Sequence, residues 1–329
     1  MSGEPGPLHR PSETCQPIVV LTGATGFVGR HLSAHLQAGG WTVRAIMRRS
    51  TDPRRLPPGV VPIQGGDDAR RIGEGVRGAH AVVHLAARVH HPGETTSRFR
   101  ERYRLDNVRP TETLLRAATS EGVPRFVFVS TVRIHGAAST SVCRADDEPA
   151  PPDPYAESKL EAEAVVRGAD RELEWVIVRP AFVYGSDGKG NFDRLVRLTR
   201  LACRIPLPLD GLTGMRSMMY VENLASLLVT CVEHPAASRR VLLAADDPPV
   251  ASNQLIRLLG SALGCRPRLY RCPPALLRAM ASLVGRSDDL SRLAHDYVVD
   301  TAPLASVLGW RSRVPIEEAL RRSVGGMMA

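Results

Sequence analysis

Hydrophobic and polar positions alternate between two patterns along the first half of the chain. Short apolar runs with the length and composition of buried strands occur at 18–22, 42–47, 60–64, 81–85, 126–131 and 175–179. Between them, apolar residues recur at the spacing of helices, at 28–38, 107–120 and 155–168. Strands that alternate with helices predict an α/β fold, with a doubly wound parallel sheet covered on both faces.

The second half of the chain is less regular. Residues 185–215 are rich in Gly, Pro and Arg, whereas 223–233 have a helical spacing and 241–244 are strand-like. From residue 250 onward, helical stretches alternate with short extended pieces, ending in a helix near 316–322. We therefore expect a smaller, discontinuous C-terminal lobe after the sheet.

This pattern divides the chain into three parts. Residues 1–16 are rich in Pro, Gly, Ser and Glu without an apolar stretch, which predicts a disordered tail and not a signal peptide. We expect a first domain at 17–184, to which 216–246 return, and a substrate-binding lobe at 185–215 and 247–329.

Composition excludes some partners. The net charge of +9 suits anionic ligands, but the arginines are scattered without a run of five basic residues, and aromatic residues make up only 5%. We therefore expect no nucleic-acid partner. No apolar run approaches the roughly 20 residues of a membrane-spanning helix, so we expect no membrane insertion.

The cysteines are widely spaced. The six of them form no CxxC and no Cys/His cluster with zinc spacing. We expect reduced thiols, a cytoplasmic protein and no metal site.

A glycine-rich segment joins the first strand to the first helix: Thr22-Gly23-Ala24-Thr25-Gly26-Phe27-Val28-Gly29. Glycines let the backbone approach a pyrophosphate, and a helix N-terminus presents N–H groups and a partial positive charge. In this context the segment predicts a Rossmann-type site for NAD or NADP. The alternative is a tight strand-to-helix turn without a ligand.

The ends of the next strands bear on the choice of cofactor. Arg48 and Arg49 follow the second strand, where an acid would favour NAD and an arginine favours the 2′-phosphate of NADP. The pair therefore favours NADP, unless both arginines stack on the adenine or face solvent. After the third strand, Asp67 and Asp68 are candidates for the adenine amino group.

Small residues follow the fourth strand. Leu85, Ala86 and Ala87 are expected beside the cofactor, whereas His84 is expected to be a packing residue.

The candidate catalytic residues lie on one predicted helix. Tyr155 and Lys159 are one turn apart, and Lys159 is one of only two lysines among 43 basic residues. A nearby ammonium would lower the pKa of the tyrosine, which could then exchange a proton with a substrate hydroxyl. Ser130 and Thr131, at the end of the fifth strand, are candidates for a third polar group.

These motifs together resemble the extended short-chain dehydrogenase/reductase superfamily, in particular its NAD-dependent nucleotide-sugar epimerase/dehydratase branch. The resemblance runs from about Ile18 to Leu320 and is nearest to UDP-hexose and UDP-N-acetylhexosamine 4-epimerases and to 4-ketoreductases. It implies a catalytic set, Asn107, Thr131, Tyr155 and Lys159. It also implies that Tyr155 and Lys159 contact the cofactor, as do Pro180 and Val183 in the segment that passes the nicotinamide.

The resemblance extends to a UDP-sugar site. It implies that Ser130 and Thr131 contact the sugar, and that Asn191, in Lys189-Gly190-Asn191-Phe192, and Arg216 contact the diphosphate. The helices at 107–120 and 155–168 form a dimer interface in many relatives, which implies a homodimer.

One departure narrows the reaction. Dehydratases of this branch carry Asp-Glu after the strand-end threonine, where this chain has Val132 and Arg133, so we do not expect dehydration. The leading hypothesis is a UDP-hexose or UDP-N-acetylhexosamine 4-epimerase that works through a 4-keto intermediate. The alternative is an NADPH-dependent 4-keto-sugar nucleotide reductase in surface-polysaccharide synthesis. A reductase of hydrophobic ketones and a non-catalytic NAD(P)-binding protein are further alternatives.

Overall fold

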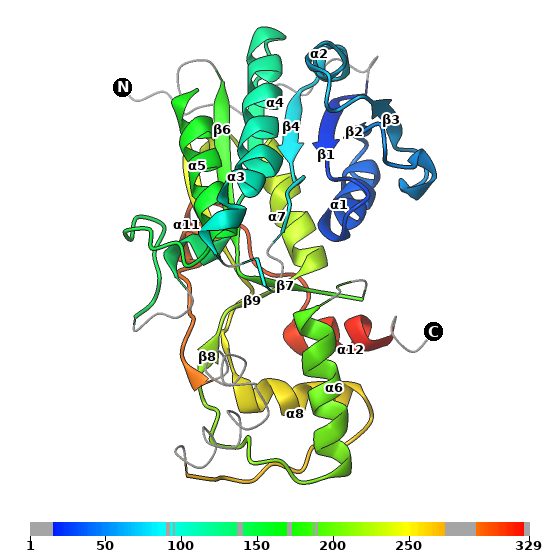
Figure 1. Cartoon of the computed structure of the whole chain (residues 1–329). Coiled ribbons are helices and arrows are strands. Elements are labelled where there is room, and N and C mark those ends of the chain that lie inside the picture. Colours follow the sequence, from blue (N-terminus) through cyan, green and yellow to red (C-terminus); the bar gives the residue numbers. More distant parts are fainter. Residues whose placement is uncertain are drawn as a thin grey trace, which may run out of the picture.

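A seven-stranded parallel sheet lies at the centre of the computed structural model (Figure 1), which describes residues 16–89, 93–94, 96–136, 141–169, 173–186, 188, 190–273 and 294–325. The expected tail therefore lies outside the described residues except for Gln16. The strands are β1 (Ile18–Thr22), β2 (Thr42–Met47), β3 (Val61–Gln64), β4 (Ala81–His84), β5 (Arg125–Val129), β6 (Glu174–Pro180) and β10 (Arg240–Ala244). Their spatial order is β10-β6-β5-β4-β1-β2-β3. The predicted fold class is confirmed.

Helices cover both faces of this sheet. One face packs against α1 (Phe27–Ala38), α7 (Val221–Glu233) and α11 (Ala302–Leu308), and the other against α2 (Ala69–Val76), α4 (Arg109–Ser120) and α5 (Pro154–Gly168). Successive residues of a strand point to opposite faces of the sheet. Val19 and Leu21 pack into the core beneath α1, α7 and α11, and Val20 packs into the core beneath α2, α4 and α5. This explains why the strands other than β3, which is largely exposed, are mainly apolar in sequence.

The order of the strands reverses beside β1. The chain runs from β1 outward through β2 and β3, then returns to build β4, β5 and β6 on the other side. The crevice outside the carboxyl ends of the strands at such a reversal is where open α/β sheets bind ligands. Thr22 at the end of β1 is in register with His84 at the end of β4, so the two loops that follow start side by side.

The second lobe contains α6 (Asn191–Arg204), α8 (Ser252–Ala262) and α12 (Ile316–Gly325) (Figure 1). Two strand pairs accompany them: β7 (Phe182–Tyr184) with β9 (Met218–Tyr220), and β8 (Met215–Arg216) with β11 (Val250–Ala251). These elements share a third core that includes Phe192, Leu255 and Leu320. One part of the expected lobe differs, because Leu304, Leu308 and Trp310 pack into the core of the main sheet.

Short helical pieces complete the described chain. They are η1 (Pro53–Arg55), η2 (Ser97–Phe99), α3 (Arg100–Tyr103), η3 (Arg104–Val108), η4 (Val132–His135) and η5 (Pro235–Ala237). Of these, η3 is a turn of π-helix that holds Asn107. Among the described residues, no helix is both long and apolar enough to cross a membrane.

The cysteines differ from expectation at one pair. Cys203, in the last turn of α6, forms a disulfide with Cys265, which follows α8. The expectation of reduced thiols throughout is therefore wrong for these two, because the lobe brings residues 62 positions apart into contact. Cys143, Cys231 and Cys272 are free thiols.

Candidate active site

The glycine turn after β1 is held close to its surroundings. Gly23 has a positive φ of 74°, and a Cβ there would lie 2.9 Å from the backbone nitrogen of Ala86. A Cβ at Gly29 would lie 2.2 Å from the carbonyl oxygen of Gly23. Both positions therefore require glycine, the first by conformation and space and the second by space alone.

The N-terminus of α1 fits a pyrophosphate. It begins at Phe27, no side chain caps it, and its first turn contains no acidic residue. Gly26 is exposed, and its backbone N–H donates to the carbonyl of Gly23 at 2.9 Å, which closes the turn in front of the helix. N–H groups at such an end attract an anion, so the turn suits the dinucleotide that its sequence predicts.

The arginines after β2 are open to solvent. Arg48 and Arg49 are both exposed, and the Arg49 guanidinium lies 3.7 Å from Asp67 and 3.4 Å from Asp68. The side chain of Asp68 also caps α2, where it accepts a hydrogen bond from the Arg70 N–H at 3.0 Å. Arg49 and Asp67 therefore remain accessible to a ligand, whereas Asp68 has a structural task.

His84 is a buried structural residue, as expected. Its ring nitrogens bond to the hydroxyls of Thr22 at 2.6 Å and Thr111 at 3.0 Å. Burial, and then the charge of Lys159, lower the pKa of His84 to about 3. The Thr22 hydroxyl also accepts from the Ala86 N–H at 3.1 Å, so this network fixes the start of the loop that holds Leu85, Ala86 and Ala87.

Asn107 joins the loop after β4 to α5. Its side chain accepts from the Arg88 N–H at 2.7 Å and donates to the Arg88 carbonyl at 3.1 Å. The same amide donates to the Ser158 hydroxyl at 2.8 Å, and that hydroxyl donates to the carbonyl of Tyr155 at 2.7 Å. Asn107 therefore sets the spacing between the loop after β4 and α5.

Tyr155 lies in the first turn of α5. Asp153 caps this helix by accepting from the Ala156 N–H at 2.9 Å. The Thr131 side chain lies close enough to Tyr155 to affect its pKa. Burial, and then the charge of Asp153, raise the pKa of Tyr155 to about 12, while Arg133 and the Thr131 side chain oppose that rise. Lys159 is not among the groups that shift this pKa, so the expected lowering by its ammonium does not appear.

Lys159 is almost completely buried. It is 2% exposed, and its ammonium lies 4.0 Å from the centre of the Phe128 ring, in cation–π contact. Burial lowers the pKa of Lys159 to about 7, against the opposing charge of Glu163 one turn further along α5. Glu163 is itself held by the buried guanidinium of Arg179, at 2.6 and 2.9 Å.

A buried hydroxyl at the end of β5 points to a ligand. Ser130 is 4% exposed, and its Oγ has no hydrogen-bond partner among the described residues. A buried polar atom in that state is costly unless something else satisfies it. Ser130 thus fits the expected contact with a polar ligand, beside Thr131.

The two residues expected beside the nicotinamide lie on neighbouring strands. Pro180 is buried at the end of β6, and Val183 is half-buried in β7.

An ion pair that the sequence did not predict stands beside Tyr155. Arg133 binds the carboxylate of Asp153 at 2.6 Å, and Asp153 is buried. The pair connects the segment after Thr131 with the cap of α5. The only local signal was spacing, since each partner lies two residues from a predicted site residue.

The two residues expected to contact the diphosphate, Asn191 and Arg216, can be located by the residues around them. Asn191 is the exposed first residue of α6. The preceding loop reaches the glycine turn, since a Cβ at Gly188 would lie 3.3 Å from the ring of Phe27. The backbone of Arg216 forms an isolated β-bridge with Tyr297. The Tyr297 hydroxyl donates a hydrogen bond to the Val132 carbonyl at 2.6 Å. Lys189 lies outside the described residues.

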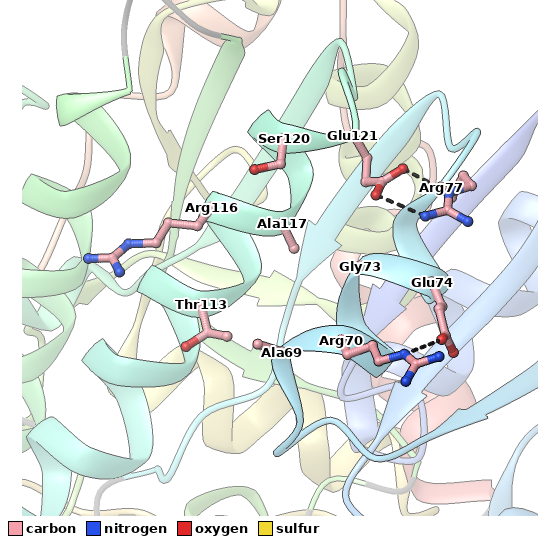
Figure 2. A pocket seen from close by; sticks show the side chains of 10 residues that line it. All are labelled: Ala69, Arg70, Gly73, Glu74, Arg77, Thr113, Arg116, Ala117, Ser120 and Glu121. Carbon is pink, nitrogen blue, oxygen red and sulfur yellow. Dashed lines mark hydrogen bonds and ion pairs between the residues drawn. The ribbon is translucent and has the colours of Figure 1, made fainter.

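A cavity of about 670 Å³ lies elsewhere, between α2 and α4 (Figure 2). Its charged residues include two pairs, Arg70 with Glu74 and Arg77 with Glu121. None of the residues expected at the cofactor or substrate site lines it.

Known proteins resemble the chain over nearly its whole length. The model of the family described as "NAD dependent epimerase/dehydratase family" matches residues 19–244. The chain is 32% identical to a UDP-glucose 4-epimerase of Vibrio cholerae, over 93% of this chain and 94% of that protein. It is 31% identical to a ceramide reductase of Caulobacter vibrioides, over 88% of each. The solved structure of MoeE5 in complex with UDP-glucose and NAD is similar with a TM-score of 0.70 and 27% identity, over 94% of this chain and 98% of that one.

Proposed function

Because this chain belongs to the NAD dependent epimerase/dehydratase family of enzymes, we propose that it is a UDP-hexose or UDP-N-acetylhexosamine 4-epimerase that works through a 4-keto intermediate. The observation that carries the proposal is the cluster of Thr131, Tyr155 and Lys159: Thr131 lies near Tyr155, and the buried Lys159 follows Tyr155 by one helical turn. This cluster follows a glycine turn suited to a dinucleotide, at the same edge of the sheet.

The chain's own residues supply the proton chemistry. Tyr155 would exchange a proton with the C4 hydroxyl, and Thr131 would orient both oxygens. A bound nicotinamide would accept and return a hydride at C4. Tyr155 is protonated at neutral pH, as an ordinary tyrosine is, and burial raises its pKa further; Arg133 and Thr131 are the groups that favour its phenolate. Lys159 would supply a cation in a site that excludes water.

The substrate side rests on two candidate phosphate contacts. Asn191 lies at an exposed helix start and Arg216 lies next to Tyr297, which bonds to Val132 beside Thr131. A guanidinium and an amide are suitable donors for a diphosphate. The Vibrio cholerae relative acts on UDP-glucose by its name, and MoeE5 was solved with UDP-glucose, which supports a UDP-sugar here.

Dehydration is not part of the proposal. The two positions that would need acidic residues are Val132 and Arg133, and the Arg133 guanidinium is bound to Asp153. Asp153 in turn caps α5, so neither group is available as an acid or base.

One observation favours a second candidate, an NADPH-dependent 4-keto-sugar nucleotide reductase. Arg48 and Arg49 are exposed after β2, where a 2′-phosphate would lie, and no acid follows that strand directly. The Caulobacter vibrioides relative is a reductase by its name.

The nucleotide that copurifies with the protein separates the two candidates. Denaturing the purified protein and identifying the released nucleotide by mass should yield NAD or NADH at nearly one per chain if the protein is an epimerase. An initially empty site that binds NADPH at least tenfold more tightly than NADH would instead support the reductase. Replacing Arg48 and Arg49 by Gln should remove that preference.

A further inference from the structure

One face of α6 combines arginines with exposed apolar side chains. Arg194, Arg197, Arg200 and Arg204 are all exposed, and so are Leu201 at 44% and Ile205, directly after the helix, at 48%. At about 100° per residue, these six positions fall within about 140° of one another around the helix axis. We call this set the α6 face. Its opposite side is buried through Phe192, Val196 and Ala202.

The α6 face continues onto the segment that follows α8. The Arg268 N–H donates to the Ala202 carbonyl at 2.8 Å, which places this segment against the last turn of the helix. The disulfide between Cys203 and Cys265 holds the same junction. Tyr270 is 47% exposed there, and Arg266 and Arg268 are exposed beside it. The hydrogen bond and the disulfide therefore hold α6 and the segment after α8 together as one surface in the folded protein.

Most of its positive charge is not neutralised. Residues 191–210 and 261–272 contain seven arginines but only two acidic residues, Asp193 and Asp210. Asp210 pairs with Arg257 and Arg271. The other six arginines of these two segments form no ion pair with a carboxylate of the described residues. Unneutralised positive charge beside exposed apolar groups is complementary to an anionic partner with an apolar interior.

We propose that the α6 face docks on the surface of an anionic membrane. Arginines on a helix attract anionic headgroups while their stems lie along apolar surface, and Leu201, Ile205 and Tyr270 can enter the boundary between headgroups and acyl chains. A nucleic acid would match the charge but offers no apolar layer for these three residues. The helix lies on the surface and does not span it, and the proposal holds whichever sugar the enzyme uses.

Vesicle flotation with the full-length protein tests the proposal. Wild type should float with phosphatidylcholine vesicles that contain 30 mol% phosphatidylglycerol and stay in solution with pure phosphatidylcholine. Arg197→Gln with Arg204→Gln should weaken binding about 25-fold, since each arginine near an anionic surface contributes roughly fivefold. The matched control is Arg311→Gln with Arg313→Gln, two exposed arginines between α11 and α12, outside the α6 face and outside the expected dimer helices.

The apolar residues have a separate signature. Leu201→Ser with Ile205→Ser should abolish the part of binding that survives 0.5 M salt, because salt screens only the charges. Equal binding by wild type and both α6 variants would overturn the proposal, as would wild type that fails to float with anionic vesicles. Preference for a DNA duplex over vesicles of equal total charge would identify a nucleic-acid surface instead.

Discussion

At the scale of single residues, Tyr155 lies between two opposite charges that belong to one ion pair. Burial has the largest effect and raises the pKa of the tyrosine, Asp153 raises it further, and Arg133 lowers it. The two charged groups are bound to each other at 2.6 Å, so their net effect on Tyr155 depends on both staying in place. This ion pair therefore modulates a proton affinity that burial mainly determines.

This arrangement predicts shifts of opposite sign. Asp153→Asn should move the pH at which kcat/KM for substrate oxidation is half-maximal to a lower value, because asparagine still caps the helix while the charge that raises the pKa of Tyr155 is lost. Arg133→Gln should move it to a higher value. The pH profile of each variant is the measurement. Shifts of the same sign would indicate that geometry, and not charge, is responsible.

Lys159 should make stability depend on pH. Its folded pKa of about 7 lies below its ordinary value of 10.5, so between these values the unfolded chain binds a proton that the folded chain does not. Stability therefore rises with pH across this window. Ligand-free Lys159→Met should melt at a higher temperature than wild type at pH 6, and the difference should shrink toward pH 10. A difference that is independent of pH would refute this reading of the burial.

At the scale of elements, α5 organises the site. It supplies Tyr155 and Lys159 to the crevice, receives Asn107 through Ser158, and holds the buried Glu163 beneath them. Two surface ion pairs, Arg100 with Glu157 and Arg104 with Glu161, attach α5 to the preceding helical segment. Exposed pairs of this kind contribute little to stability, so the buried contacts carry the positioning.

All seven strands of the main sheet could be predicted, because six of them are mainly apolar and buried runs; β3, Val61–Gln64, is short and largely exposed. Two helices could not. In α2 the glycines 73 and 75 interrupt the apolar spacing, and α6 follows a Gly-rich segment and carries four arginines, which together resemble a loop. The lobe packing that stabilises α6 is not visible in local sequence.

The features of the candidate site also fall into those that the local sequence predicts and those that only the fold reveals. The glycine turn and the Tyr155–Lys159 pair are local motifs with fixed spacing, and the sequence finds them. The contacts of Arg133 with Asp153 and of Glu163 with Arg179 join different elements, so only the fold reveals them. The unpartnered hydroxyl of Ser130 is likewise a property of packing.

The link between α6 and α8 can be tested chemically. Because Cys203 and Cys265 are bonded, the protein denatured without reductant should release four titratable thiols, and six after reduction. A thiol-reactive dye gives this count directly. Six thiols without reductant would contradict the bond. In that case, replacing Cys203 by Ser should not change the melting temperature.

At the scale of the whole molecule, the expected cofactor site lies at the carboxyl edge of the main sheet. The loop before α6, which belongs to the second lobe, approaches this edge where Gly188 lies next to the ring of Phe27.

The helices α4 and α5 lie side by side on one face of the sheet (Figure 1). We expect a homodimer through these two helices. Light scattering after gel filtration should give about twice the chain mass of 35.7 kDa, and a value near that mass would refute the dimer.

The most direct test of the central claim is to follow C4 of the sugar. Purified protein is incubated with UDP-glucose and, separately, with UDP-N-acetylglucosamine, and the products are identified by proton NMR. We predict that wild type converts one of them to its 4-epimer up to equilibrium, and that Tyr155→Phe, folded and loaded with nucleotide, does not. If wild type forms no 4-epimer but oxidises NADPH with a 4-keto-sugar nucleotide, the epimerase assignment is wrong.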